Sequence, residues 1–221
     1  NTVYNSVLAS GEWYRFYIEK SGVYKTSKTF LQSLGFDPSK VDPRRIKIYG
    51  NGGKMLPLAN NTYYPADLTE NAIQIIGESD GTFNNEDYIL FYAEGVENWS
   101  TESQTNLNLY ATKSYYYVTV AGNDGKRIPN FNQPSGNSTL ELNTFDDYQF
   151  HEIDKTNIAH LGRQWFGEAF DITQEQEFEF NFPNIETSIP VKIELNAASA
   201  AFTPTSFAVS ANGQSIGNIT F

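Results

Sequence analysis

Short stretches in which hydrophobic and polar residues alternate recur along this chain, and this period of two is typical of half-buried β-strands. Residues 177–182 are one example, because Phe178, Phe180 and Phe182 alternate with polar residues. Alternation, or a run of aromatic and β-branched residues, predicts strands over residues 1–10, 12–19, 45–49, 72–76, 87–93, 110–120, 148–153, 177–182, 189–195 and 206–210. The nearly continuous apolar run at 87–93 predicts a central strand that is buried on both faces.

One short helix is predicted near the start of the chain. Phe30, Leu31 and Leu34 fall on one face at helical spacing, and a glycine follows them as a natural left-handed stop. Thr26 or Ser27 can cap the first turn by accepting a hydrogen bond from a backbone N–H group. Since the other predicted elements are strands, the fold class is mainly β.

Turn residues divide the chain. Asn51-Gly52 signals a hairpin, and Arg127–Thr139 is rich in proline, glycine, asparagine and serine, which predicts a linker. We therefore expect a β-rich α+β domain over residues 1–139 and the start of a β-sandwich domain over 140–221. The last residues read as a strand that stops at the chain end, so we expect a piece of a longer protein whose second domain is truncated.

Charge and composition exclude several classes of function. The net charge is −11 and the pI is about 4.6, which argues against binding to nucleic acid or to an anionic membrane surface. No apolar run approaches the roughly 20 residues that a membrane span needs. The chain has no cysteine and begins at Asn1 without a signal peptide. We interpret the acidic charge as that of a soluble, extracytoplasmic protein surface.

Catalytic residues are not predicted in this chain. His151 and His160 are its two histidines, and without cysteine neither can belong to a Cys–His pair. The G-x-S-x-G motif of serine hydrolases does not occur either. Each histidine is interpreted as a hydrogen-bonded residue of a strand or loop. An enzyme that works through two carboxylates stays open as an alternative, because 26 acidic residues offer too many pairs to rank.

One acidic loop offers oxygen ligands to a hard cation such as Ca²⁺. Asp80, Asn84, Glu86 and Asp87 lie within a short span, although their spacing is not that of an EF-hand. The competing interpretation is a solvated turn between two strands, and we predict no cofactor.

Two sets of aromatic residues suggest binding surfaces. Arg163, Trp165 and Phe166 are of the types favoured at protein interfaces, and the competing interpretation is that they fill a domain junction. The tyrosines at 63–64 and 115–117 could form a platform for sugars, or could simply pack within strands.

Three blocks of sequence resemble one protein family in the same order. They are GEWYRFYIEKSGVYKTSKTFLQSLGFDPSKVDPRRIKIYGNGG at 11–53, DGTFNNEDYILFYAEG at 80–95 and HEIDKTNIAHLGRQWFGEAFD at 151–171. Together they resemble the start of the PorU-type sortases of the type IX secretion system, which are cell-surface members of the gingipain-type cysteine peptidases. In that family such a region precedes the peptidase domain.

The resemblance implies a role without chemistry of its own. The parent would be a cysteine endopeptidase that removes C-terminal secretion signals from cargo and helps to attach the cargo to lipopolysaccharide. This region would be a scaffold that contacts the peptidase domain of the same chain, or outer-membrane components of the secretion system. The alternative function is a carbohydrate-binding β-sandwich module that uses tyrosine and tryptophan faces.

Overall fold

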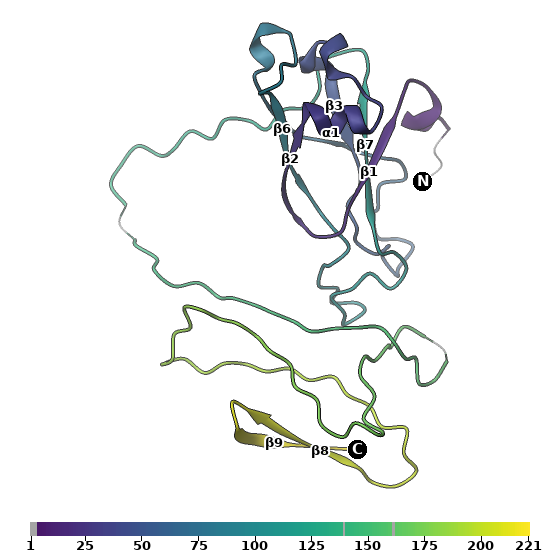
Figure 1. Cartoon of the computed structure of the whole chain (residues 1–221), viewed down its shortest axis with the longest axis vertical. Helices are drawn as coiled ribbons and strands as arrows, with labels where there is room; N and C mark the ends of the chain where they lie inside the picture. Colours follow the sequence, from purple (N-terminus) through teal and green to yellow (C-terminus); the bar gives the residue numbers. More distant parts are fainter. Residues whose placement is uncertain (1–3, 139, 161) are drawn as a thin grey trace. The chain divides into compact units, whose positions relative to one another are not determined.

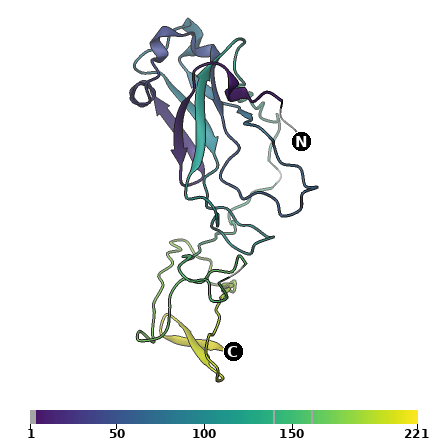
Figure 2. The ribbon, with the colours of Figure 1, turned by 90° about the vertical axis from the view of Figure 1, so that its right-hand side faces the viewer.

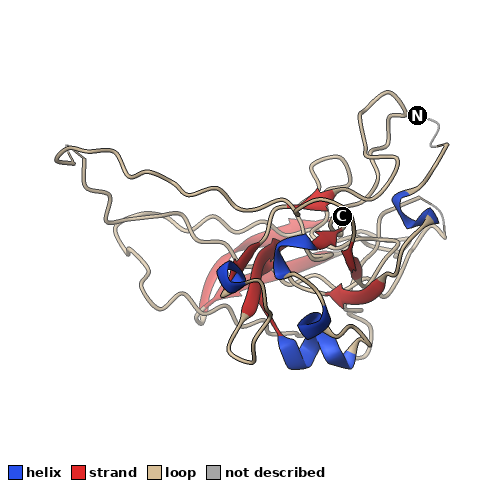
Figure 3. Cartoon of the chain, turned by 90° about the horizontal axis from the view of Figure 1, so that it is seen from above, coloured by secondary structure: helices blue, strands red, loops and turns tan. Residues whose placement is uncertain are grey.

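The computed structural model describes residues 4–138, 140–160 and 162–221 (Figure 1). The chain divides into two compact units, Asn1–Glu141 and Leu142–Phe221. Antiparallel strands dominate the regular structure and the helical segments are short (Figure 3), so the predicted mainly β class is confirmed. No helix among the described residues is long and apolar enough to cross a membrane. The predicted domain boundary at 139/140 stays a prediction, and Thr139 itself lies outside the described residues.

Two antiparallel sheets form the first unit (Figure 2). The first sheet has the order β1-β7-β3-β4, with β1 at Tyr14–Ile18, β7 at Ser114–Val120, β3 at Ile46–Tyr49 and β4 at Glu70–Asn71. The second sheet has the order β2-β6-β5, with β2 at Gly22–Ser27, β6 at Tyr88–Ala93 and β5 at Gln74–Ile76. Consecutive strands β1 and β2 lie in different sheets, so the chain crosses between the layers early.

The hydrophobic core fills the space between these two sheets. Ring centroids of Phe16 on β1 and Phe91 on β6 are 5.9 Å apart, and those of Phe91 and Tyr116 on β7 are 5.5 Å apart. The buried hydrophobic residues come from both sheets and their connections: Phe16, Ile18, Leu31, Phe36, Ile46, Ile48, Ile73, Ile75, Phe83, Ile89, Phe91, Ala93, Tyr116 and Val118. Alternate residues of each strand point inward, as the period of two requires.

The predicted helix is α1, Lys28–Ser33, and its predicted cap is confirmed at Ser27. The Ser27 hydroxyl accepts a hydrogen bond from the Phe30 N–H at 3.2 Å, and Gly35 ends the segment at φ +93°. Leu31 is the helix residue that reaches the core. Among the described residues, the other helical segments are short 3₁₀ turns: η1 at Val7–Ala9, η2 at Pro38–Lys40, η3 at Pro43–Arg45 and η4 at Glu78–Asp80.

Several details of the first unit differ from the sequence-based predictions. The strand expected over 1–10 is wrong where the structure describes it, because Val7–Ala9 is a 3₁₀ turn; residues 1–3 lie outside the described residues. Strand β6 is buried on one face only, since Tyr92 is 57 % exposed on the outer face of its sheet.

The hairpin expected at Asn51-Gly52 is also wrong, because β3 pairs with β7 and with the distant β4. The Asn51 side chain accepts a hydrogen bond from Thr69 N and donates one to the Asp67 carbonyl. These two bonds hold the ends of a long loop together, so the chain does not fold back directly after β3.

In the second unit, β8 at Ser206–Ala211 pairs with β9 at Gln214–Thr220 to form a hairpin. The strand expected at 206–210 is confirmed, whereas those at 148–153, 177–182 and 189–195 are wrong. The Gln149 side chain accepts a hydrogen bond from the Asn181 N–H and donates one to the Asn181 carbonyl. In a β-sheet, these two backbone groups would instead pair with the backbone of a neighbouring strand. Phe178 and Phe180 are 40 % and 46 % exposed, so the apolar side of the predicted strand is not fully buried.

Candidate junction and interaction surfaces

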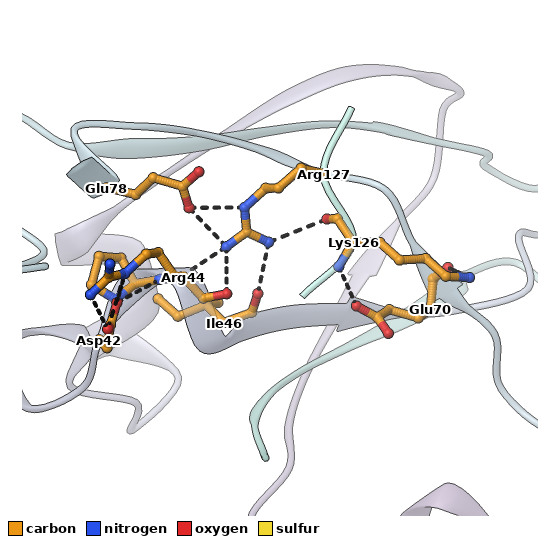
Figure 4. A network of polar contacts seen from close by, with 8 residues as sticks. Asp42, Arg44, Ile46, Glu70, Glu78, Lys126 and Arg127 are labelled. Atoms are coloured by element: carbon orange, nitrogen blue, oxygen red, sulfur yellow. Dashed lines mark hydrogen bonds and ion pairs between the residues drawn. The ribbon is translucent and has the colours of Figure 1, made fainter. Parts of the chain in front are cut away.

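Arg127 fixes the point at which the chain leaves the two-sheet unit (Figure 4). Its Nε and Nη2 atoms each lie 2.8 Å from Oε2 of Glu78. The guanidinium also donates hydrogen bonds to the backbone carbonyls of Pro43, Arg44, Ile46 and Lys126. One planar side chain therefore joins η3, the start of β3, η4 and the departing chain, because guanidinium carries five donors in a rigid fork.

Backbone hydrogen bonds support the same exit point. Ile73 N donates to the Lys126 carbonyl at 3.2 Å, and Ile128 N donates to the Ile73 carbonyl at 2.9 Å. The Lys126 N–H donates to Oε1 of Glu70 at 2.6 Å. Arg127 and Ile128 are thus bonded into the first unit, and a linker over 127–139 stays a prediction.

The role of Arg127 could not be predicted from the sequence. Its acceptors are mostly backbone carbonyls about 80 residues earlier in the chain, and backbone carbonyls carry no sequence signal. The sequence offers one weak signal, because Arg127 is a basic residue directly before a stretch rich in turn residues.

Asp42 and Arg44 form a second charged pair beside this network (Figure 4). Asp42 caps η3 by accepting from the Arg44 N–H at 3.0 Å, and its carboxylate also accepts from Nε and Nη2 of Arg44. These hydrogen bonds from Arg44 lower the pKa of the Asp42 carboxyl to about 2. The pair is exposed, so solvent screens it.

We expect the Asp42 carboxyl to keep its charge down to about pH 2, as followed by NMR titration of its carboxyl carbon. A carboxyl with a depressed pKa contributes stability above its ordinary pKa of 3.8, and this contribution is lost as the pH falls through about 2. Arg44→Gln should return the pKa of Asp42 toward its ordinary value. A midpoint near 4 in the unchanged protein would contradict the assignment.

The predicted interface residues lie in the second unit. Phe166 exchanges two backbone hydrogen bonds with Thr156, at 2.8 and 2.9 Å, which fixes the segment that carries them. Trp165 is 43 % exposed, and Arg163 and Phe166 are half-buried. All three residues thus lie in or next to a loop that is closed by the hydrogen bonds between Thr156 and Phe166. Their role as an interface stays a prediction.

His151 contacts groups of the same unit. Its Nε2 lies 3.1 Å from Oε1 of Glu168, and its ring centroid lies 4.6 Å from that of Phe178. The hydrogen bond from His151 lowers the pKa of Glu168, with a smaller contribution from Lys155 at 3.7 Å. The arrangement is that of a hydrogen-bonded histidine. His160, the other histidine, lies in a turn at φ +53°.

The Asp80 and Asp87 carboxylates of the acidic loop accept hydrogen bonds from groups of the same loop. Asp80 accepts from Thr82 N and from the Asn84 side chain, while Asp87 accepts from Asn84 N at 2.6 Å. Glu86 is exposed on the same loop. Within residues 4–138, 140–160 and 162–221, no three His, Cys, Asp or Glu side chains gather as metal ligands. The loop geometry is that of a turn held by Asx-type bonds.

The tyrosines considered for sugar binding point in different directions. Tyr116 faces the core and its hydroxyl bonds both the N–H and the carbonyl of Glu94, whereas Tyr115 and Tyr117 face outward. Tyr63 is exposed and Tyr64 is half-buried on the loop before β4. Tyr116 therefore cannot share an outward face with Tyr115 and Tyr117, and a sugar platform at either set stays a prediction.

A small cavity of about 140 Å³ lies between the loops at 53–56 and 96–108. Trp99 lines it and is half exposed. Most polar side chains around it hold the loops themselves: Asn98 donates to the Gly95 carbonyl and Asn108 donates to the Gly53 carbonyl. The cavity is smaller than the roughly 300–1,000 Å³ usual for ligand pockets.

No protein-family model matches the chain, and no curated protein sequence matches it. Its fold is similar to that in the crystal structure of dimeric latent PorU from Porphyromonas gingivalis. The match has a TM-score of 0.60 and 18 % sequence identity, and it covers 98 % of this chain and 20 % of the PorU chain. The chain thus has a PorU-like fold and spans about a fifth of the length of that protein.

Proposed function

We propose that this chain is the non-catalytic N-terminal region of a cell-surface sortase of the type IX secretion system. The observation that carries the proposal is the PorU-like fold over 98 % of the chain. The ordered sequence blocks at 11–53, 80–95 and 151–171 support it. The parent would be a cysteine endopeptidase that removes C-terminal secretion signals from cargo and helps to attach the cargo to lipopolysaccharide.

The role of this region would be to position the peptidase domain and to dock partners. It has no cysteine, so the nucleophile of a cysteine peptidase must come from elsewhere in the parent. Arg127 and its carbonyl partners tie the last residues of the two-sheet unit to its core, which suits a first unit that acts as a scaffold. Its location would be extracytoplasmic, at the outer membrane, with the peptidase domain and secretion components as partners.

The test compares three forms of the parent protein on a cargo that carries a C-terminal secretion signal. Residues 1–221 alone are expected to leave the cargo intact, and the whole parent is expected to cleave it. The parent with its catalytic cysteine replaced serves as the control and should be inactive. Cleavage by residues 1–221 alone would overturn the proposal, as would a parent in which deleting this region changes neither cleavage nor secretion of the cargo.

A further inference from the structure

The outer face of the first sheet carries a contiguous set of aromatic and basic side chains. We call it the aromatic–cation face and define it by seven residues: Trp13, Arg15, Tyr17, Tyr49, Lys113, Tyr115 and Tyr117. The register makes them neighbours, since Tyr17 lies opposite Tyr115 and Arg15 lies opposite Tyr117 across β1 and β7. Tyr117 also lies opposite Tyr49 on β3. The face therefore extends over three adjacent strands.

Cations on this face lie over aromatic rings. Lys113 Nζ is 3.8 Å from the ring centroid of Tyr17, and Cζ of Arg15 is 4.9 Å from that of Tyr115. The Tyr17 and Tyr115 rings meet at 68°, with centroids 6.4 Å apart. Such cation–π contacts hold long side chains in place, so less conformational entropy is lost when a ligand binds them.

The electrostatic character of the face is opposite to that of the chain. Within the part of the chain that the structure describes, Arg15, Lys47 and Lys113 have no carboxylate within ion-pair distance, although the chain has a net charge of −11. Glu70, on the neighbouring strand β4, accepts hydrogen bonds from the Lys126 N–H at 2.6 Å and from the Tyr49 hydroxyl at 3.5 Å. Another acid, Glu19, follows the end of β1. The basic groups are thus available to an acidic ligand.

We propose that the aromatic–cation face docks an acidic segment of a partner protein. Tyrosine, tryptophan and arginine are the residues enriched at the centres of protein interfaces. Carboxylates of the partner complement Arg15 and Lys113, and the tyrosine rings supply apolar contact area. A sugar ring would need an open aromatic face, and cations cover the faces of Tyr17 and Tyr115. The inference deepens the docking role proposed above and rests on it.

The test measures binding of a fluorescent oligoglutamate peptide to residues 1–221 at low ionic strength. The double variant Arg15→Glu with Lys113→Glu is expected to weaken binding about tenfold or more, equivalent to about 1.4 kcal/mol. The matched control, Lys25→Glu with Lys28→Glu, has the same net charge but changes β2 and α1 rather than this face, and it should change binding less than about twofold. A neutral variant, Arg15→Gln with Lys113→Gln, guards against misfolding and should give an intermediate loss.

Each contrary result overturns the inference. Equal losses in the two charge-reversed variants would mean that net charge alone governs binding. Saturable binding of polygalacturonate to this face, without binding of oligoglutamate, would make it a glycan surface. The absence of saturable peptide binding would remove the docking site. All of these measurements are independent of cargo cleavage, so failure here is distinguishable from failure of the proposed sortase role.

Discussion

Replacing Phe91 by alanine is expected to destabilise the first unit by about 3–5 kcal/mol, the usual cost of truncating a fully buried phenylalanine. Phe91 is completely buried on β6. Its ring meets Phe16 and Tyr116 of the opposite sheet at centroid distances of 5.9 and 5.5 Å, and Tyr24 of its own sheet at 6.4 Å. The truncation therefore opens a cavity where the two sheets meet, and rigid strands on both sides limit how far the cavity can collapse.

Urea unfolding followed by tryptophan fluorescence measures this loss. Trp165 belongs to the second unit, so the experiment uses a Trp165→Phe background in which Trp13 and Trp99 report the first unit alone. The matched control is Tyr92→Ala, the next residue on the same strand, whose side chain is 57 % exposed on the outer face. We expect the control to cost less than about 1 kcal/mol. Similar losses in both variants would contradict a core between the two sheets.

The strands of the first unit follow largely from local sequence. Strand β7 was predictable because its alternation separates Tyr116 and Val118, which are buried, from Tyr115 and Tyr117, which face outward. Strand β2 was not predicted, because Gly22–Ser27 is short and includes lysine and exposed Val23. Its strand conformation comes from its antiparallel partner β6, and a partner distant in sequence is not visible in a local window.

Pairing also explains the errors in the second unit. Residues 177–182 have the alternation of a half-buried strand, but a strand needs a hydrogen-bonded neighbour and a covering layer. The Gln149 side chain occupies the backbone groups of Asn181, and the phenylalanines of the segment stay partly exposed. A truncated sandwich domain, as the sequence predicts here, remains a hypothesis about the parent protein.

The candidate surfaces were predictable to a smaller extent than the strands. Trp165 and Phe166 were found from residue type, because large aromatics are informative wherever they occur. Arg15 was not found, since its significance depends on Tyr115 across the sheet, a neighbour that only the register reveals. Residue type therefore predicts which side chains can bind, and the pairing of strands decides which of them form one face.

Replacing Arg127 by methionine is expected to destabilise the first unit by about 2–3 kcal/mol. Methionine keeps the apolar stem but removes every donor, leaving Glu78 and the carbonyls of Pro43, Arg44 and Ile46 without their shared partner. Hydrogen bonds to charged groups contribute about 1.5–3 kcal/mol each where they are buried. The Arg127 and Glu78 side chains are 24 % and 27 % exposed, so water can hydrogen-bond to some of the groups that lose Arg127. We therefore expect the total loss of stability to be close to the contribution of one such hydrogen bond.

The same unfolding assay separates the effect of charge from that of geometry. Arg127→Lys keeps the positive charge but cannot reach Glu78 and several carbonyls at once, so we expect it to recover less than about half of the lost stability. The exposed neighbour Arg45 forms no ion pair among the described residues, and Arg45→Met should be nearly neutral.

Hydrogen exchange adds a local measurement, because the Ile73 and Ile128 amides that bracket Arg127 should lose protection in Arg127→Met. Full recovery by lysine would show that charge alone holds the exit point. Unchanged protection at Ile73 and Ile128 would show that the backbone ladder holds it without Arg127. In either case the attachment of residues 126–128 to the first unit would not depend on the guanidinium fork and would have to come from the backbone hydrogen bonds of Ile73.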